Sequence, residues 1–109
     1  MINELVQRLS DGEHEIVLGY RNESYEEIKQ RITDGYIHIK FTQTKGGTEL
    51  GINVDLSSTN IKDVDFTKGD GLLHIEGITN LNYNPVRCLA DIDLASRKGL
   101  GFLQIISVE

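Results

Sequence analysis

The chain has 109 residues, of which 39% are hydrophobic and 26% charged, and its formal net charge is −6. This length and composition are typical of one globular domain, spanning residues 1–109, with a single hydrophobic core, and they exclude a disordered chain. The acidic excess argues against binding to a phosphate backbone, because nucleic-acid-binding surfaces are rich in Lys and Arg.

Two short helices and a strand are predicted at the start of the chain. Apolar residues of segment 2–9 recur at helical spacing, and segment 15–20 has the composition of a first strand. Ser24 and Glu27 have the spacing of a capping box, which begins a second helix. Gly35 is placed to end that helix, because glycine adopts the left-handed conformation of a C-terminal cap without strain.

Residues 36–57 alternate apolar and polar on both sides of Gly46-Gly47, which predicts a β-hairpin with a tight two-residue turn. In that register Lys45 faces Thr48. Every apolar residue of one face then meets another apolar residue, in the pairs Phe41–Ile52, Ile39–Val54 and Ile37–Leu56. On the other face the same register places His38 opposite Asp55.

Four later segments, 60–66, 72–81, 86–95 and 100–108, predict further strands. The last is apolar on both faces, which is typical of a strand that is covered on both sides. The predicted fold class is therefore α+β: a mostly antiparallel, curled β-sheet of about six or seven strands, with the two short N-terminal helices packed on one face.

His38 and Asp55 are the residues considered for catalysis. A carboxylate opposite an imidazole raises the pKa of the histidine and orients its ring, which is half of a general-base arrangement. The pair lacks a nucleophile of known proximity, because Ser57 and Thr42 are neighbours only by strand alternation, and cross-strand pairs of this type are more often surface ion pairs. We therefore predict no catalytic residue, with His38 and Asp55 as weak candidates only.

Two Asp-x-Asp motifs are the only candidate metal ligands. Residues two apart on a strand share a face and lie roughly 6.5–7 Å apart, so neighbouring strands would bring four carboxylates together, a donor set that suits Mg²⁺ or Ca²⁺. The motif is short and unspecific, and the three histidines lie on separate segments without zinc-ligand spacing. We expect no metal and no cofactor; the weak candidates are Asp63, Asp65, Asp91 and Asp93.

Cys88 is the single cysteine, which excludes an intramolecular disulfide, and its apolar alternation with Ala90 and Ile92 predicts a buried thiol. The first residues lack a basic segment followed by a long apolar one, and no apolar run is long enough to span a membrane. The expected location is the cytoplasm.

The acidic residues are concentrated, since segment 49–93 contains eight of them against three Lys and Arg residues. Such a surface attracts basic partners. We therefore expect a non-enzymatic module that binds a basic protein, without contact to nucleic acid or membrane. The expected partner-binding residues are Tyr36, Asp55, Asp63, Asp65, Glu76, Asp91 and Asp93.

In size and charge the chain is similar to bacterial immunity proteins, which inhibit a toxin such as a nuclease; the likeness covers no motif. Two alternatives stay open. One is a ligand-binding or enzymatic domain with a pocket near His38 and Asp55. The other is a self-assembling structural subunit that uses the strand at 100–108. The expected state is a monomer or a small homo-oligomer.

Overall fold

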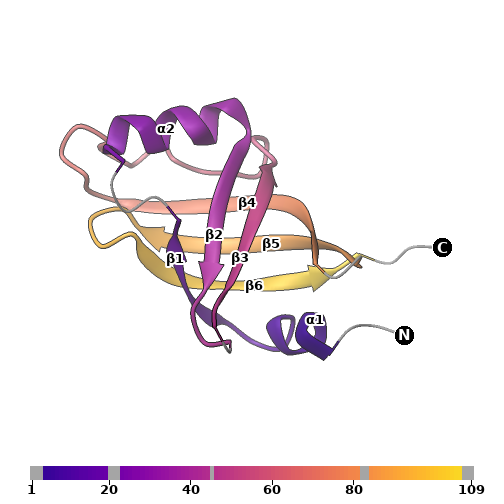
Figure 1. Ribbon diagram of the computed structural model, residues 1–109. Helices are drawn as coiled ribbons and strands as arrows, with labels where there is room; N and C mark the ends of the chain where they lie inside the picture. The colour runs from indigo at the N-terminus through magenta and orange to yellow at the C-terminus, as the bar shows by residue number, and fades with distance from the viewer. Residues whose placement is uncertain (1–3, 20–22, 45, 82–83, 107–109) are drawn as a thin grey trace.

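Six antiparallel strands close into a barrel in the order β1-β2-β3-β4-β5-β6 (Figure 1). The structure, a computed structural model, describes residues 4–19, 23–44, 46–81 and 84–106. Its elements are α1 (Glu4–Leu9), β1 (His14–Leu18), α2 (Tyr25–Asp34), β2 (Tyr36–Phe41), β3 (Thr48–Val54), β4 (Leu72–Leu81), β5 (Asn84–Asp93) and β6 (Lys98–Ile105). The prediction of a mostly antiparallel sheet with two short helices is confirmed, and the closed barrel is more specific than the curled sheet expected.

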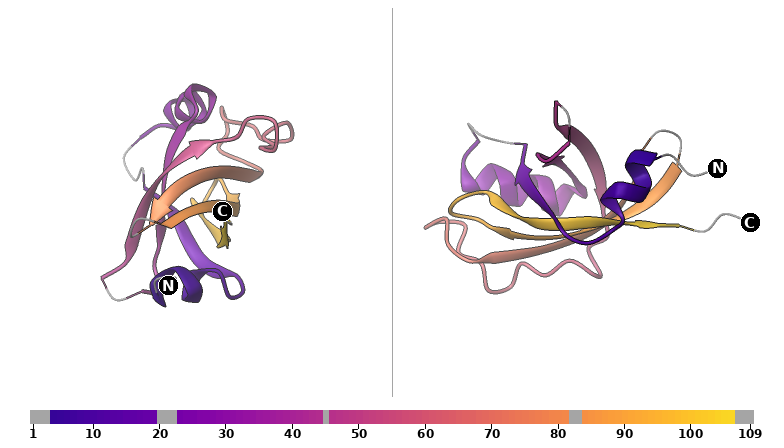
Figure 2. Two further views of the ribbon diagram at one scale, coloured as in Figure 1. Left: turned by 90° about the vertical axis from the view of Figure 1, so that its right-hand side faces the viewer. Right: turned by 90° about the horizontal axis from the view of Figure 1, so that it is seen from below.

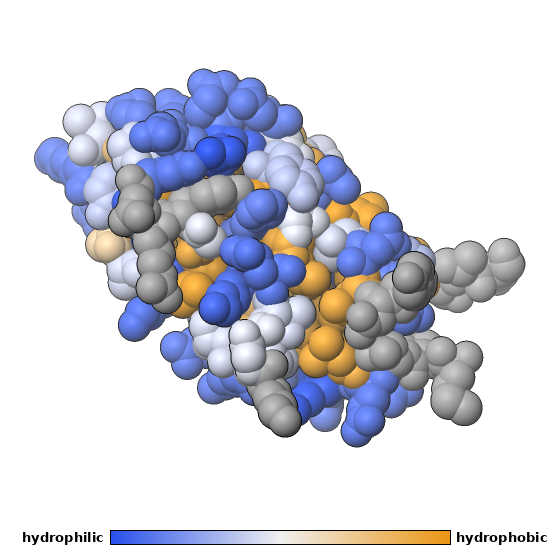
Figure 3. Space-filling model, viewed as in Figure 1, coloured by the Kyte–Doolittle hydropathy of each residue, from blue (hydrophilic) through white to orange (hydrophobic). Residues whose placement is uncertain are grey.

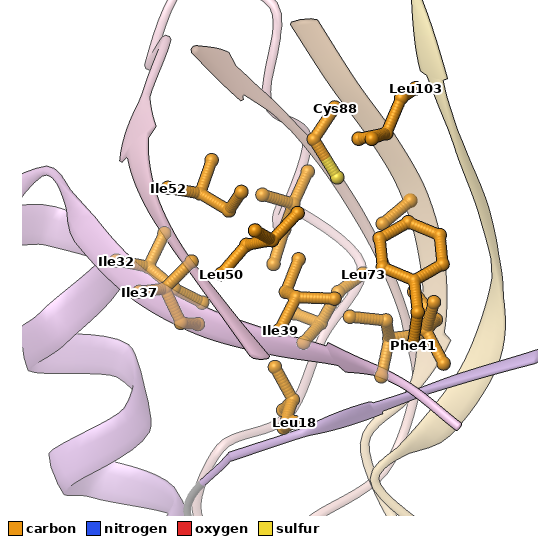
Figure 4. Close-up of a cluster of buried hydrophobic side chains, with 14 of the residues drawn as sticks. Leu18, Ile32, Ile37, Ile39, Phe41, Leu50, Ile52, Leu73, Cys88 and Leu103 are labelled. Carbon is orange, nitrogen blue, oxygen red and sulfur yellow. The ribbon is translucent and has the colours of Figure 1, made fainter. Parts of the chain in front are cut away.

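The interior of the barrel is filled by aliphatic side chains from every strand. On β2 the alternation places Ile37, Ile39 and Phe41 inside with no exposed surface, and Tyr36 and His38 outside. Figure 4 shows these three inward residues packed against side chains from β3, β4 and β5. A barrel of this size holds only side chains in its interior, so its core is solid.

The two helices contribute apolar residues to the same core. Ser24 and Glu27 form the predicted capping box, and Gly35 ends α2 in the left-handed conformation at φ 89°. Ile28 and Ile32 of α2 are fully buried, as is Val6 of α1. The prediction that both helices cover one face is wrong, because α1 packs against β6 and α2 against β2 on opposite sides of the barrel (Figures 1 and 2).

The predicted β2–β3 hairpin forms, but its register is shifted by four residues. Ile37 pairs with Ile52 rather than with Leu56, and Ile39 pairs with Leu50 rather than with Val54. The shift is an even number, so the same side chains still face the core. Leu56 lies beyond the end of β3 and is 54% exposed.

A longer connection replaces the tight turn because Phe41 is the last residue of β2 that pairs with β3. Beyond it, the amide of Thr42 donates to the carbonyl of Glu15 and so joins β1 instead. Thr44 Oγ1 lies 2.7 Å from Thr48 Oγ1, which closes the connection. Gly46 and Gly47 do have the positive φ angles expected of them. The predicted partner of Thr48, Lys45, lies outside the described residues.

Residues 55–71 form a loop, so the predicted strand at 60–66 is wrong. Among the described residues its isolated β-bridges are Asn60–His74, which joins it to β4, and Asp65–Asp70, which lies within the loop. The carboxylate of Asp65 accepts hydrogen bonds from the amides of Thr67 and Lys68 at 2.9 and 3.0 Å, a local turn that competes with strand pairing.

The remaining strands agree closely with the predicted segments. β6 pairs with β5 along its length and with β1 over residues 98–101, so it lies within the barrel wall. β3 and β4 meet at two pairs, Asn53–Ile78 and Val54–Gly77. A side chain at position 77 would overlap the carbonyl oxygen of Asn53 and approach Ile52 Cγ2 to 2.5 Å, so closure of the barrel at this seam requires glycine.

Candidate functional site: a charged network on the outer barrel face

A connected network of charged side chains covers the outside of β4 and β5 and the start of the 55–71 loop. Its members follow one another in space in the order Asp91, His74, Glu76, Arg87 and Asp55, which we call the charged network. Each is held by hydrogen bonds to the next, so the positions of five ionisable groups are coupled.

Strand alternation and register bring these residues together. Because Leu73 and Ile75 face the core, His74 and Glu76 face outward on β4. Arg87 and Asp91 face outward on β5 for the same reason, and His74 is the direct cross-strand partner of Asp91. Asp55 arrives from the loop, where its amide donates to the carbonyl of Glu76 at 2.7 Å.

His74 lies between two carboxylates. Its Nδ1 is 2.8 Å from Asp91 Oδ1, and its Nε2 is 2.6 Å from Glu76 Oε2. The backbone of His74 pairs in both directions with Asn60, through amide–carbonyl distances of 2.8 and 3.0 Å. The imidazole ring is therefore fixed in position by contacts on both of its nitrogens.

Arg87 connects the other two carboxylates. Its Nε and Nη2 donate to Glu76 Oε1 at 3.1 and 2.9 Å, and Nη2 also donates to Asp55 Oδ2 at 2.9 Å. The side chain of Arg87 is 23% exposed, and that of Glu76 is 19% exposed. These ion pairs are partly shielded from water, so they are stronger than pairs on an open surface.

Hydroxyl groups of the loop complete the site. Ser57 and Ser58 donate to the two carboxylate oxygens of Asp55 at 2.6 and 3.2 Å. Thr59 Oγ1 accepts from the amide of Glu76 at 3.2 Å. Residues 55–60 thus cover the edge of β4 that does not pair with β5, and the charged network holds the base of the loop to the barrel.

The charges shift one another's pKa values. Hydrogen bonds that His74 donates to Glu76 and then to Asp91 raise its pKa above the ordinary 6.5. Hydrogen bonds from His74 and then Arg87 lower the pKa of Glu76 below its ordinary 4.5. Ser57, followed by Arg87 and Ser58, lowers the pKa of Asp55 well below its usual range. These contacts favour the charged forms of His74, Glu76 and Asp55.

Exposed apolar side chains lie beside the network on the same strands. Leu100 is 49% exposed and is the cross-strand partner of Asp91. Leu89 pairs with Glu76 on β4 and with Phe102 on β6. Ile78 is 43% exposed and pairs with Arg87. The β4–β6 face, as we call it, is therefore amphipathic; it comprises Leu72, His74, Glu76, Ile78, Arg87, Leu89, Asp91, Asp93, Lys98, Leu100, Phe102 and Gln104.

Apolar patches interrupt a mostly hydrophilic surface. In the view of Figure 3 they are visible in the middle of the molecule and toward the end at which β6 finishes. Ile105, the last residue of β6, is 40% exposed.

The predicted partner-binding residues separate into groups. Asp55, Glu76 and Asp91 belong to the charged network. Asp93 follows on β5, opposite Leu72 and Lys98, and accepts a hydrogen bond from Ser96 Oγ at 3.1 Å.

The other three lie elsewhere. Tyr36 is 48% exposed on β2 and lies over Gly51, in edge contact with the ring of His38. Asp63 and Asp65 are in the loop, where they line an open hollow of about 510 Å³ beside Glu26 and Lys29 of α2.

The weak catalytic pair is not formed. His38 pairs with Gly51, and Asp55 is bound to Arg87 and the loop serines instead, because the register shift carries Asp55 past the end of β3. The core beneath the hairpin is filled rather than hollow. Both ring nitrogens of His74 are instead in contact with carboxylates. This geometry disfavours a pocket centred on His38 and Asp55.

The two Asp-x-Asp motifs have different environments. Asp91 and Asp93 share the outer face of β5, whereas Asp63 and Asp65 lie in a loop, so the four carboxylates do not lie on neighbouring strands. Within the part of the chain that the structure describes, no group of three or more His, Cys, Asp or Glu residues has a geometry that could hold a metal ion. Cys88 is buried, and burial raises the pKa of its thiol to about 12.

His74 and Arg87 are the residues that the sequence did not single out. Their strands were predicted, and alternation alone places Arg87 and Asp91 on one face. The pairing of Arg87 and Asp91 with β4 depends on the register between β4 and β5, which alternation alone does not determine. No protein family matches the sequence, and no curated protein matches it either. No helix among the described residues has the length and apolar character needed to cross a membrane.

Proposed function

We propose that the chain is a small non-catalytic binding module that docks a basic protein through the β4–β6 face. The observation that carries this proposal is the amphipathic composition of the face: carboxylates in fixed positions stand directly beside exposed leucine and isoleucine side chains. Fixed charges beside apolar surface are what a specific protein interface requires.

The charge of the network supports a basic partner. Asp55, Glu76 and Asp91 together carry three negative charges against the single positive charge of Arg87 when His74 is neutral. Asp91 is the most accessible of these carboxylates, with 52% of its side chain exposed. A partner with Lys or Arg at this position gains electrostatic steering, which increases the rate of association and weakens as salt is added.

The apolar residues supply the short-range part of binding. Leu100 and Ile78 are both more than two-fifths exposed, and Leu89 and Phe102 are half-buried between them. Removing such side chains from water on docking stabilises a complex by roughly 25 cal/mol per Å² of apolar surface, before the costs of association. The network is largely satisfied within the chain, so the face is rigid before it binds.

Within this class, an inhibitor of a cationic toxin, such as an immunity protein directed at a nuclease, is the most specific form of the proposal. Small size, net negative charge and a preorganised face support it. A catalytic role has less support, because the buried interior is filled and both nitrogens of His74 are occupied.

The test compares binding by the tagged chain with two charge-matched variants. Asp91→Lys/Asp93→Lys reverses two charges on the β4–β6 face, and Asp11→Lys/Glu13→Lys reverses two exposed charges in the connection before β1. A basic protein that is bound by the wild type and the second variant, but not by the first, supports the proposal. Equal binding to both variants would reject the β4–β6 face as the docking surface.

A further inference from the structure

We infer that the protonation state of His74 controls the charge of the β4–β6 face. While both ring nitrogens carry protons, His74 binds Asp91 and holds it in the charged network. Loss of one proton breaks the bond to Asp91 and makes the net charge of the face more negative by one. The consequence for docking rests on the function proposed above. The coupling between His74 and Asp91 does not, because it lies within the chain.

The number of protons on the ring of His74 decides how many carboxylates it can bind. A neutral imidazole has one N–H group and one nitrogen lone pair, whereas an ionised carboxylate can only accept hydrogen bonds. Nδ1 and Nε2 of His74 face carboxylate oxygens at 2.8 and 2.6 Å. Both bonds exist together only in the imidazolium form. After loss of a proton, one ring nitrogen presents its lone pair to a negative charge, and that contact becomes repulsive.

The two hydrogen bonds of His74 are not equivalent, so the structure indicates which of them breaks when a proton is lost. Glu76 is 19% exposed and is held from its other oxygen by Arg87, at 2.9 and 3.1 Å. Asp91 is 52% exposed. Water can replace the imidazole at Asp91 at little cost, whereas Glu76 cannot move without breaking its pair with Arg87. The neutral ring therefore keeps its proton on Nε2, which donates to Glu76, and its hydrogen bond to Asp91 breaks.

The ionisable groups around His74 set the pH at which this happens. Glu76 on β4 and Asp91 on β5 favour the protonated ring, while Arg87 opposes it from beyond Glu76. In the loop, Asp55 is bound to Arg87. Lys62 lies two residues after Asn60, which pairs with the backbone of His74.

The residue of β6 that pairs with Asp91 is Leu100, and the residue of β1 that pairs with Leu100 is Glu15. The carboxylates nearest the ring outweigh burial, so the pKa of His74 is raised above 6.5. With rising pH the network changes from one net negative charge to two, because three carboxylates are then opposed by Arg87 alone.

The decisive experiment is an NMR titration of the isolated chain between about pH 5 and 9, the range in which histidines titrate. The ring of His74 and the side-chain carboxyl carbon of Asp91 are followed together. We expect one shared midpoint above 6.5, and a lower midpoint for the ring in Asp91→Asn. In His74→Gln the response of Asp91 in this range should vanish, whereas in the control His38→Gln it should persist. A midpoint for His74 at or below 6.5, or an Asp91 carboxyl that does not follow it, would overturn the inference.

A second measurement tests the effect on docking with decaarginine as the probe. At low ionic strength one added charge about 8 Å from a bound cation changes affinity about twofold, so in low salt the peptide should bind that much more tightly above the midpoint of His74 than below it. The gain should disappear in His74→Gln. Equal affinity on the two sides of a confirmed midpoint would overturn the link to docking. Absence of peptide binding at every pH would count against the proposed function, while the titration would still decide the inference.

Discussion

Replacement of Arg87 by Met tests whether the charged network stabilises the barrel. The substitution removes the guanidinium, which makes three hydrogen bonds to Glu76 and Asp55, and keeps an apolar stem of similar length. In the variant both carboxylates stay in place without their shared cation. Glu76 retains His74, and Asp55 retains Ser57, so neither is left wholly unpartnered.

The expected loss lies between two limits. Hydrogen bonds to charged groups contribute roughly 1.5–3 kcal/mol when buried, and exposed ion pairs roughly 0.2–1 kcal/mol. Because the side chain of Arg87 is 23% exposed, solvent screens part of the interaction, and we expect a loss of about 1–2 kcal/mol in the free energy of unfolding at neutral pH.

The loss should also depend on pH in a defined direction. Arg87 lowers the pKa of Glu76 and of Asp55 in the folded chain. A group whose folded pKa is lowered contributes stability above its unfolded pKa, and that contribution disappears as pH falls through the folded value. The difference between wild type and Arg87→Met should therefore be full near neutral pH and shrink below about pH 4.

Urea denaturation at neutral pH and at about pH 3 measures both effects. Arg31→Met is the matched control, because Arg31 pairs with Glu23 on the surface and its side chain is 46% exposed. Its loss should be clearly smaller. If Arg87→Met were no less stable than Arg31→Met, or if its deficit were unchanged in acid, the network would not be a stabilising feature of the fold.

Three further predictions follow from the geometry. Gly77→Ala should destabilise the barrel by about 1–3 kcal/mol or more, since the added methyl group overlaps the backbone of Asn53, and urea denaturation would show no shift in midpoint if the β3–β4 seam could relax. Cys88 should react with a disulfide reagent at about pH 8 only as fast as the chain unfolds, because burial raises its pKa to about 12; reaction at the rate of a free thiol would contradict its burial. A double-mutant cycle between His38 and Asp55, read by denaturation, should give a coupling energy near zero, whereas a measurable coupling would restore the hairpin register in which they face each other.

The sequence predicts which side chains face the core better than it predicts which residues pair. In β2, β4 and β5, alternation alone identifies the buried residues, because side chains of a strand point to opposite faces with a period of two. A register shift of four residues preserves that period. Ile37 therefore remains buried in either register, and only its partner changes from Leu56 to Ile52.

The register itself depends on contacts that are distant in the sequence. The Gly46-Gly47 pair favours a tight turn, but Thr42 is taken up by Glu15 of β1, which a local reading cannot anticipate. In the 55–71 loop, the carboxylate of Asp65 accepts hydrogen bonds from nearby backbone amides, so the segment predicted as a strand does not form one. Both errors come from tertiary or side-chain competition for backbone hydrogen bonds.

The sequence predicts the candidate site only in part. The acidic residues Asp55, Glu76 and Asp91 are visible as excess charge in the sequence, and the structure brings them into one network. Arg87 and His74 acquire their roles only through the β4–β5 register and the return of the loop. Charge composition thus indicates the sign of the surface, and pairing decides which charges meet.

The measurement that tests the central claim most directly is the affinity of one basic protein partner for the wild-type chain and for the two charge-matched variants, at low and at high salt. We predict that Asp91→Lys/Asp93→Lys weakens binding at least tenfold, mainly through slower association at low salt, and that Asp11→Lys/Glu13→Lys weakens it much less; tenfold corresponds to about 1.4 kcal/mol. Equal affinities for the two variants, without dependence on salt, would contradict docking through the β4–β6 face.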